Sequence, residues 1–181
     1  MNEICTVLHT EDGRVLGIQY PKLIDSTEGL GELLHLLDGK SKYFERYELV
    51  LAVPVGFGIA SVLDDEKKPM DNYPFLRLMI SEDFPNLIDG SKNRLLNHLC
   101  TRYKVWLGNL GSGTRTNLVA VMEHCFDGLV LDRTFTQANA DKGIFPVMLR
   151  EIQKYTTHLI VPGISTGRYR PIRLKHIEQL I

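Results

Sequence analysis

The sequence predicts an α/β protein, because strand-like segments alternate with helical segments along its length. Several apolar segments are too short for a helix and rich in residues that suit buried strands. Between them lie segments whose apolar residues recur with the helical period. Alternation of this kind builds either an open doubly wound sheet or a barrel, and apolar periodicity alone does not distinguish the two.

The first expected elements are a hairpin and a capped helix. Residues 5–9 and 14–18 have the composition of short strands, and the Asp-Gly pair at 12–13 between them forms turns readily. Ser26 is expected to cap a helix that Gly39 ends. The apolar stripe of this helix consists of Leu30, Leu33, Leu34 and Leu37.

The apolar pattern of the remaining sequence predicts mainly parallel strands with helices between them. Buried strands are expected at residues 49–55, 75–80, 105–107, 129–131 and 159–161. Helical patterns cover residues 91–102, 114–124, 145–155 and 173–180. Because the first three of these helical segments each stand between two strand segments, the repeated unit is strand, helix, strand.

Length and charge limit the kinds of protein this chain can be. Its 181 residues, 44% of them hydrophobic, suit one domain over 1–181, and no linker divides them. A formal charge of -1 provides no field that would concentrate nucleic acid or anionic membrane around the protein. No apolar run approaches the roughly 20 residues that span a bilayer, and the start does not resemble a signal peptide. The sequence therefore predicts a cytoplasmic protein.

The three cysteines predict free thiols. Cys5, Cys100 and Cys125 are odd in number and widely separated, which fits buried thiols in a reducing compartment better than a disulfide framework. His98 lies near Cys100 and His124 precedes Cys125, but these spacings match no common set of zinc ligands. We therefore predict no metal site and no cofactor.

Two linked segments resemble the EAL-domain family, whose active members are TIM-barrel-like and hydrolyse cyclic di-GMP with two divalent metals. Residues 107–113 read Leu-Gly-Asn-Leu-Gly-Ser-Gly where the family has Leu-Asp-Asp-Phe-Gly-Thr-Gly. Residues 126–135 follow the family's Phe-Asp-x-x-Lys-x-Asp-Arg-Ser-Phe pattern. Weaker matches at 17–19, 78–82 and 162–166 occur in the family's order, so the resemblance spans most of the chain.

The chain departs from this family where the metal and catalytic ligands belong. Two magnesium ions need hard anionic oxygen ligands and a bridging water. Of the ligand positions considered, Glu82 keeps the family's side chain, and the replaced ones are Gln19, Pro54, Gly108, Asn109, Val130 and Pro162. We therefore predict a protein that is not an enzyme and has no catalytic, metal or cofactor-binding residues. The acids Glu82 and Asp132 are expected to anchor loops at strand ends by hydrogen bonds; the alternative is weak binding of one metal.

The resemblance also implies an incomplete barrel. The sequence stops at Ile181, before the family's last strand, and residues 26–48 and 59–74 are shorter than the matching parts of an active EAL domain. The expected fold is a truncated TIM-barrel-like EAL fold with one antiparallel first strand. Free edges are then expected at the first and last strands, and such edges invite pairing with another chain.

Within the family, the chain looks most like the short degenerate EAL-like proteins of enteric bacteria, the YdiV-like flagellar anti-activators. Residues 75–85 carry much of this likeness. It implies a regulator that represses motility by binding a protein partner, FlhD of the flagellar master regulator FlhDC. It implies no direct contact with nucleic acid or membrane, and neither binding nor hydrolysis of cyclic di-GMP. Bulk composition does not distinguish an interface from other surface, so the partner-binding residues stay unknown.

Two other functions stay open at this point. The first is a sensor that binds cyclic di-GMP without hydrolysing it, although Pro54 and Val130 disfavour a formed pocket. The second is a residual phosphodiesterase that uses Glu82 and Asp132 with one metal. A separate feature is the basic run of Arg168, Arg170, Arg173 and Lys175. This run reads either as the solvated face of a helix or as a surface for an acidic partner or phosphates.

Overall fold

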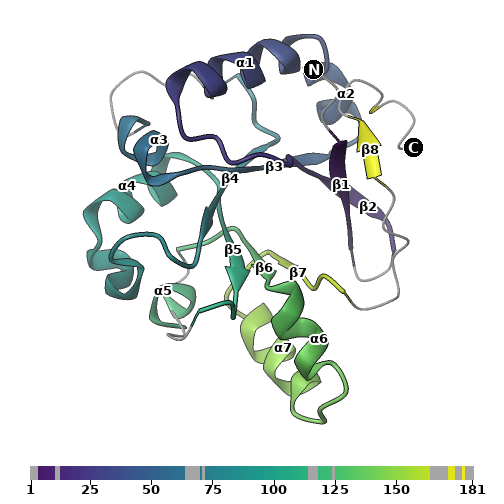
Figure 1. The fold of residues 1–181 in the computed structure, drawn as a ribbon, viewed down its shortest axis with the longest axis vertical. Helices are drawn as coiled ribbons and strands as arrows, with labels where there is room; N and C mark the ends of the chain where they lie inside the picture. The colour runs from purple at the N-terminus through teal and green to yellow at the C-terminus, as the bar shows by residue number, and fades with distance from the viewer. Residues whose placement is uncertain are drawn as a thin grey trace. The chain divides into compact units, whose positions relative to one another are not determined.

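The chain divides into two compact units. Unit 1 consists of Met1–Leu78 and Gly167–Ile181, and unit 2 of Met79–Thr166. The expectation of a single domain over residues 1–181 stays a prediction. The computed structural model drawn in Figure 1 describes residues 4–10, 13–63, 70, 72–113, 118–123, 125–163, 171–173 and 177.

Unit 1 begins with the predicted hairpin. Strands β1 (Ile4–His9) and β2 (Val15–Gln19) pair antiparallel, with Thr6 opposite Gln19. Gly13 supports the turn with φ 83°, a left-handed conformation that glycine adopts without steric cost. The third strand, β3 (Val50–Pro54), runs parallel to β2. The antiparallel first strand and the parallel pair that follows it confirm the expected order.

The other side of β1 is covered, which corrects two expectations. Strand β8 (Pro171–Arg173) pairs antiparallel with β1, so the first strand does not present a free edge. Arg173 therefore ends a strand and does not begin a helix. Three residues give no periodicity, and proline is rare inside strands, so the sequence carried no signal for β8. The remaining members of the basic run, Arg168, Arg170 and Lys175, lie outside the described residues.

The helices of unit 1 include one predicted helix and two short ones that were missed. Helix α1 (Thr27–Asp38) begins where expected, because the Ser26 side chain accepts a hydrogen bond from the Gly29 N–H at 3.1 Å. Its buried residues are Leu30, Leu33 and Leu37. Helices α2 (Ser41–Arg46) and α3 (Phe57–Val62) span six residues each, too few for an apolar period to be recognised.

The core of unit 1 forms around β3. Residues 49–53 of this strand region are almost fully buried, as a parallel strand covered on both faces requires. Phe44 of α2 stacks on Phe75 with ring centroids 4.5 Å apart. The Phe75 carbonyl accepts a hydrogen bond from the Leu51 N–H at 3.0 Å, which joins the segment before strand β4 (Leu76–Ser81) to β3.

Unit 2 contains the parallel strands β5 (Val105–Leu110), β6 (Gly128–Leu131) and β7 (His158–Ile160). All three were predicted, but β5 continues three residues further than expected, through Gly108 and Asn109. Trp106 is fully buried, and a side chain at Gly128 would collide with its ring. This contact explains why glycine begins β6.

Helices separate these strands as the sequence predicts. The described helices are η1 (Leu87–Lys92), α4 (Arg94–Arg102), α5 (Leu118–Met122), α6 (Arg133–Asn139) and α7 (Phe145–Gln153). The expected helix at 114–124 is described only as α5, since 114–117 and 124 lie outside the described residues. Helix α6 was missed. In Figure 1 it lies beside α7, and Phe135 contacts Phe145 with centroids 6.5 Å apart.

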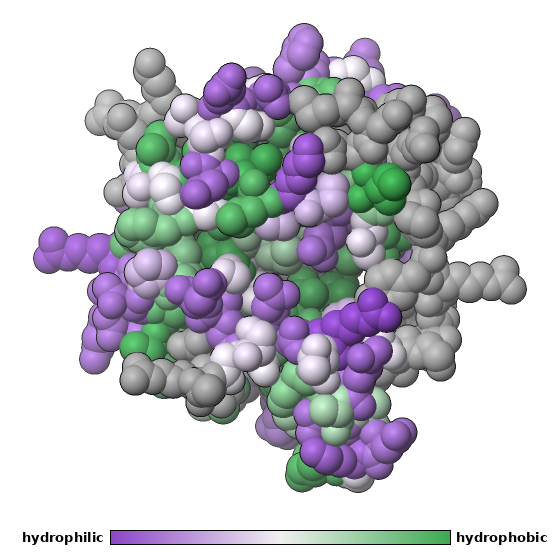
Figure 2. All heavy atoms as spheres, viewed as in Figure 1, coloured by the Kyte–Doolittle hydropathy of each residue, from purple (hydrophilic) through white to green (hydrophobic). Residues whose placement is uncertain are grey.

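The exposed surface is mixed in character. On the face drawn in Figure 2, hydrophobic areas are interrupted by hydrophilic residues. In the part of the chain that the structure describes, no helix is both long and apolar enough to cross a membrane. Large apolar side chains that remain exposed include Leu23 and Phe57 in unit 1 and Ile88, Leu118, Val119, Met122, Ile144 and Val147 in unit 2.

Candidate functional site

The strand ends of unit 2 bring together most of the positions where the sequence replaces a ligand. Glu82 directly follows β4, and Gly108 and Asn109 lie in β5. Val130 lies in β6, and Pro162 follows β7. Because the carboxyl ends of parallel strands share one edge of the sheet, the edge used for ligands in open α/β folds, these positions form the candidate site of this unit.

The space beside Gly108 is filled by an apolar side chain. A Cβ at this position would lie 3.0 Å from Sδ and 3.1 Å from Cγ of Met79. Met79 is buried, and so is Val130 in β6. An acidic side chain at position 108 would therefore have to displace a thioether and enter apolar surroundings, which disfavour a charged group.

Asn109 lies at a local irregularity of β5. The pairing with β6 passes from Leu107 opposite Leu129 to Leu110 opposite Leu131, so β5 contains one extra residue. Asn109 is exposed and has φ 57°, a left-handed conformation that asparagine tolerates better than most residues. Its side chain offers only a neutral carbonyl and an amide to a ligand.

Glu82 is engaged by the loop after β5. Its Oε2 accepts hydrogen bonds from the Gly113 N–H at 2.9 Å, the Gly111 N–H at 3.1 Å and the Ser112 hydroxyl at 3.4 Å. Glu82 is only 7% exposed, so these donors compensate the burial of its charge. The carboxylate thus anchors a loop, as the sequence analysis expected.

Asp132 also has a structural role. Its Oδ1 accepts a hydrogen bond from the Phe135 N–H at 2.7 Å, which caps the start of α6. Its backbone carbonyl accepts a second hydrogen bond from the Thr136 hydroxyl at 2.9 Å. One carboxylate oxygen of each acid, Oε2 of Glu82 and Oδ1 of Asp132, thus accepts hydrogen bonds from backbone N–H groups.

Unit 1 contains the other two replaced positions, each at a strand end. Gln19 is the last residue of β2, and Pro54 is the last residue of β3. The Pro54 carbonyl accepts a hydrogen bond from the Ile24 N–H at 2.8 Å. A proline ring has no donor or acceptor atom to offer a metal, and a glutamine side chain provides only a neutral carbonyl.

These side chains do not form a metal centre for phosphodiester hydrolysis. Two dications in such a centre need several carboxylates, and the ligand positions supply one, Glu82, beside a glycine, two prolines, a valine and two neutral amides. Among the described residues, no group of three or more His, Cys, Asp or Glu side chains is placed to hold a metal. The donor set at these positions is therefore not that of a two-metal hydrolase.

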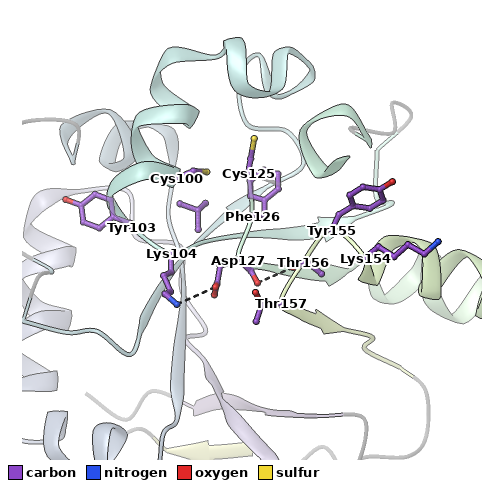
Figure 3. Close-up of a pocket in the computed structure, with 11 residues that line it drawn as sticks. Cys100, Tyr103, Lys104, Cys125, Phe126, Asp127, Lys154, Tyr155, Thr156 and Thr157 are labelled. Carbon is purple, nitrogen blue, oxygen red and sulfur yellow. Dashed lines mark hydrogen bonds and ion pairs between the residues drawn. The ribbon is translucent and has the colours of Figure 1, made fainter. Parts of the chain in front are cut away.

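A cavity of about 520 Å³ lies at the amino ends of β5, β6 and β7. Asp127 is its central acid: Oδ2 accepts a hydrogen bond from Trp106 Nε1 at 3.1 Å, and Oδ1 lies 3.7 Å from Lys104 Nζ. Figure 3 shows Lys104 directed toward Asp127, whereas Lys154 points away from it. Lys154 instead pairs with Glu151 at 2.6 Å. The charged groups of this cavity are thus paired within the protein.

Cys100 and Cys125 line the same cavity. Burial raises the pKa of the Cys100 thiol to about 12, and the nearby Cys125 adds to the rise. Burial also raises the pKa of Cys125, with a further contribution from Glu123. Both thiols are free, as predicted, but only Cys5 is fully buried. Because the thiolate is the metal ligand and the nucleophile, a raised pKa lowers the fraction of each thiol that can act in either way at neutral pH.

Comparison with known proteins places the chain among the EAL-like proteins. No family model matches the sequence. The anti-FlhC(2)FlhD(4) factor YdiV of Escherichia coli is 31% identical over 177 residues, which cover 91% of this chain and 74% of the relative. The protein of the same name from Salmonella arizonae is 30% identical over 175 residues, 90% of this chain and 73% of the relative.

Two solved structures share the fold. The crystal structure of the EAL-like domain protein YdiV has a TM-score of 0.85 at 22% identity and covers 99% of this chain and 95% of that one. The EAL domain of Mycobacterium smegmatis DcpA has a TM-score of 0.69 at 16% identity, with the same coverage. Together with the replaced ligands, these likenesses show a degenerate domain and not an active phosphodiesterase. The chain belongs to the YdiV family of EAL-like proteins and has their α/β, truncated-barrel fold.

Proposed function

We propose that this chain is a non-catalytic regulator that represses motility by binding the flagellar master regulator FlhDC. The observation that carries the proposal is the likeness over 91% of the chain to a relative named as an anti-FlhC(2)FlhD(4) factor. The replaced ligands support the non-catalytic part, because two-metal hydrolysis of a phosphodiester needs anionic oxygen ligands that these positions do not supply.

We further propose that the contact is made with the FlhD subunit and does not require cyclic di-GMP. The names of the relatives specify the complex and leave the subunit open. Glu82 supports independence from the nucleotide, since its carboxylate is already bound by the loop at 111–113. The same proposal places the protein in the cytoplasm, because a transcription regulator acts where the DNA is.

A co-purification experiment with separate subunits tests both parts. The tagged chain is mixed with purified FlhD, purified FlhC or the FlhDC complex, each with and without cyclic di-GMP. We expect FlhD and FlhDC to be retained equally well with and without the nucleotide, and FlhC alone to pass through. Retention of FlhC but not FlhD would overturn the choice of subunit. Failure to retain any of the three would overturn the binding function.

The alternative of a cyclic di-GMP sensor predicts a different dependence. A sensor would retain its partner only in the presence of the nucleotide, or only in its absence, because a ligand shifts a binding equilibrium by its differential affinity for the two states. Equal retention under both conditions therefore separates the regulator from the sensor. Adding magnesium to a parallel sample and measuring the remaining cyclic di-GMP tests the residual phosphodiesterase in the same experiment.

A further inference from the structure

Strand β1 has the composition of an aggregation-prone edge. Its six residues, Ile-Cys-Thr-Val-Leu-His, are mostly apolar or β-branched and contain no proline, glycine, lysine, arginine or acid. Six-residue segments of this kind pair readily with other strands when a sheet edge presents them to solvent. β1 is also the antiparallel end of the β1–β2–β3 order, so β2 satisfies only one of its two sides.

Strand β8 has the opposite composition. It consists of only three residues, begins with Pro171 and ends with Arg173. Its register places Arg173 opposite Ile4, Ile172 opposite Cys5 and Pro171 opposite Thr6. Shortness, proline and a charged side chain are the features by which natural sheets prevent an edge from pairing further. With β8 at the edge of the sheet, the edge strand is one that disfavours further pairing, whereas β1 would favour it.

The segment that carries β8 is anchored beyond the strand. Ile177 is fully buried, at 0% exposure, so the chain after β8 is held by the core as well as by the strand pairing. Burial of an isoleucine side chain stabilises the folded segment, because it removes apolar surface from water. This anchor lets a strand of only three residues stay in place over β1.

We propose that β8 is a guard strand that closes the outer edge of β1 and prevents it from pairing with β1 of a second copy of this chain. Two β1 strands related by a two-fold axis run antiparallel, which is the geometry that β8 already provides. When β8 detaches, the strand that pairs with the edge of β1 is therefore β1 of a second copy. By preventing this self-association, β8 keeps the chain free to bind its protein partner.

The test removes the backbone N–H donors of β8 in the whole chain given by the sequence. Successive N–H groups of a strand point to opposite sides, and Pro171 has none, so the double substitution I172P and R173P removes every donor that β8 can offer to β1. We expect light scattering to report at least a doubling of the mass relative to the parent protein. Hydrogen exchange of the amides in residues 4–6 should accelerate in the fraction that stays unassociated.

Two matched variants separate guarding from general destabilisation. L30A removes part of the α1 core and leaves β8 intact, so it should lower the thermal midpoint without changing the mass. I4K, added to the double proline variant, places a charge on β1 where Ile4 is 55% exposed. Charges on an edge strand oppose pairing, so the parent mass should return. A double proline variant that keeps the parent mass while its β1 amides exchange rapidly would overturn the proposal.

If the proline variant does not fold, a disulfide between β1 and β8 provides a second test. Cys5 and Ile172 are opposite in the register, and paired antiparallel residues have Cα separations within the range of disulfides. I172C is oxidised with glutathione disulfide, which takes up the two electrons and two protons as two glutathione molecules. On heating below the unfolding midpoint, the locked protein should associate less than its reduced form. Equal association of both forms would overturn the proposal.

Discussion

Met79 and Glu82 limit which ligands unit 2 could bind at the carboxyl ends of its strands. Met79 fills the space beside Gly108, and Glu82 is committed to the loop at 111–113. One former ligand position has therefore become apolar, and the carboxylate that remains has become a backbone anchor.

Replacing Glu82 should destabilise the fold. In E82A the N–H groups of Gly111 and Gly113 lose a buried acceptor, so we expect the free energy of unfolding to fall by about 1–3 kcal/mol. Urea unfolding at neutral pH measures the change. The exposed Glu32 on α1 provides the control, because E32A should change stability by no more than about 0.5 kcal/mol. Equal effects of the two substitutions would contradict the role of Glu82.

Restoring an acid at position 108 should not restore hydrolysis. G108A introduces a Cβ 3.0 Å from Met79 Sδ and should cost about 1–3 kcal/mol of stability. G108D adds a carboxylate without a partner in the same apolar space, so it should cost more than G108A. Urea unfolding compares the two variants, and chromatography measures cyclic di-GMP after incubation with magnesium. Turnover by G108D would show that the remaining ligands still assemble a centre.

At the scale of elements, apolar runs predicted the buried strands, and apolar periodicity predicted the longer helices but not the short ones. Helix α1 and strand β3 lie where capping and apolar runs placed them. Helices α2, α3 and α6 span six, six and seven residues, which is less than the length over which a period can be read. These helices depend on tertiary contacts, such as Phe44 of α2 against Phe75, to fold.

The contact between η1 and α5 should depend on pH. Glu123, which follows α5, accepts hydrogen bonds from Ser91 of η1, and these bonds hold the pKa of its carboxyl below the usual range. Because the pKa is lower in the folded state, the stabilisation is present above the unfolded value and is lost as the pH falls through the folded value. E123Q should therefore lose less of its thermal midpoint than the parent between neutral pH and about pH 3.

The control for this pH effect is another exposed acid. Glu32 is an exposed acid of α1 in unit 1, so E32Q should follow the parent curve through the same range. A parent and an E123Q protein whose midpoints fall in parallel would show that the hydrogen bonds to Ser91 do not link η1 to α5. Circular dichroism at each pH provides the midpoints.

At the scale of the whole molecule, the missing ligand set predicts indifference to the nucleotide. A ligand that binds only the folded state raises the thermal midpoint, because its stabilisation grows with the logarithm of one plus its concentration over its dissociation constant. With magnesium and a large excess of cyclic di-GMP, we expect no shift of the midpoint and no saturable heat in calorimetry. A saturable heat would show that the chain binds cyclic di-GMP. The sensor function would then depend on whether the nucleotide also changes the retention of the partner in the co-purification experiment.

Family membership and the loss of activity were determined by the sequence, whereas the state of the sheet edge was not. Side-chain chemistry at a motif can be read one position at a time, so Gly108, Asn109 and Val130 already exclude a two-metal centre. The composition and the net charge are likewise properties of the sequence and do not depend on the tertiary structure.

Only the tertiary structure decided which residues meet. Glu82 binds backbone groups 29 and 31 residues further along the chain, and β1 pairs with β8 from the other end of the sequence. Pairings over such separations depend on how the chain closes its loops and packs its core, and no local pattern encodes them. The free edge expected at β1 was wrong for this reason: its neighbour is a three-residue strand, and only the folded chain brings the two together.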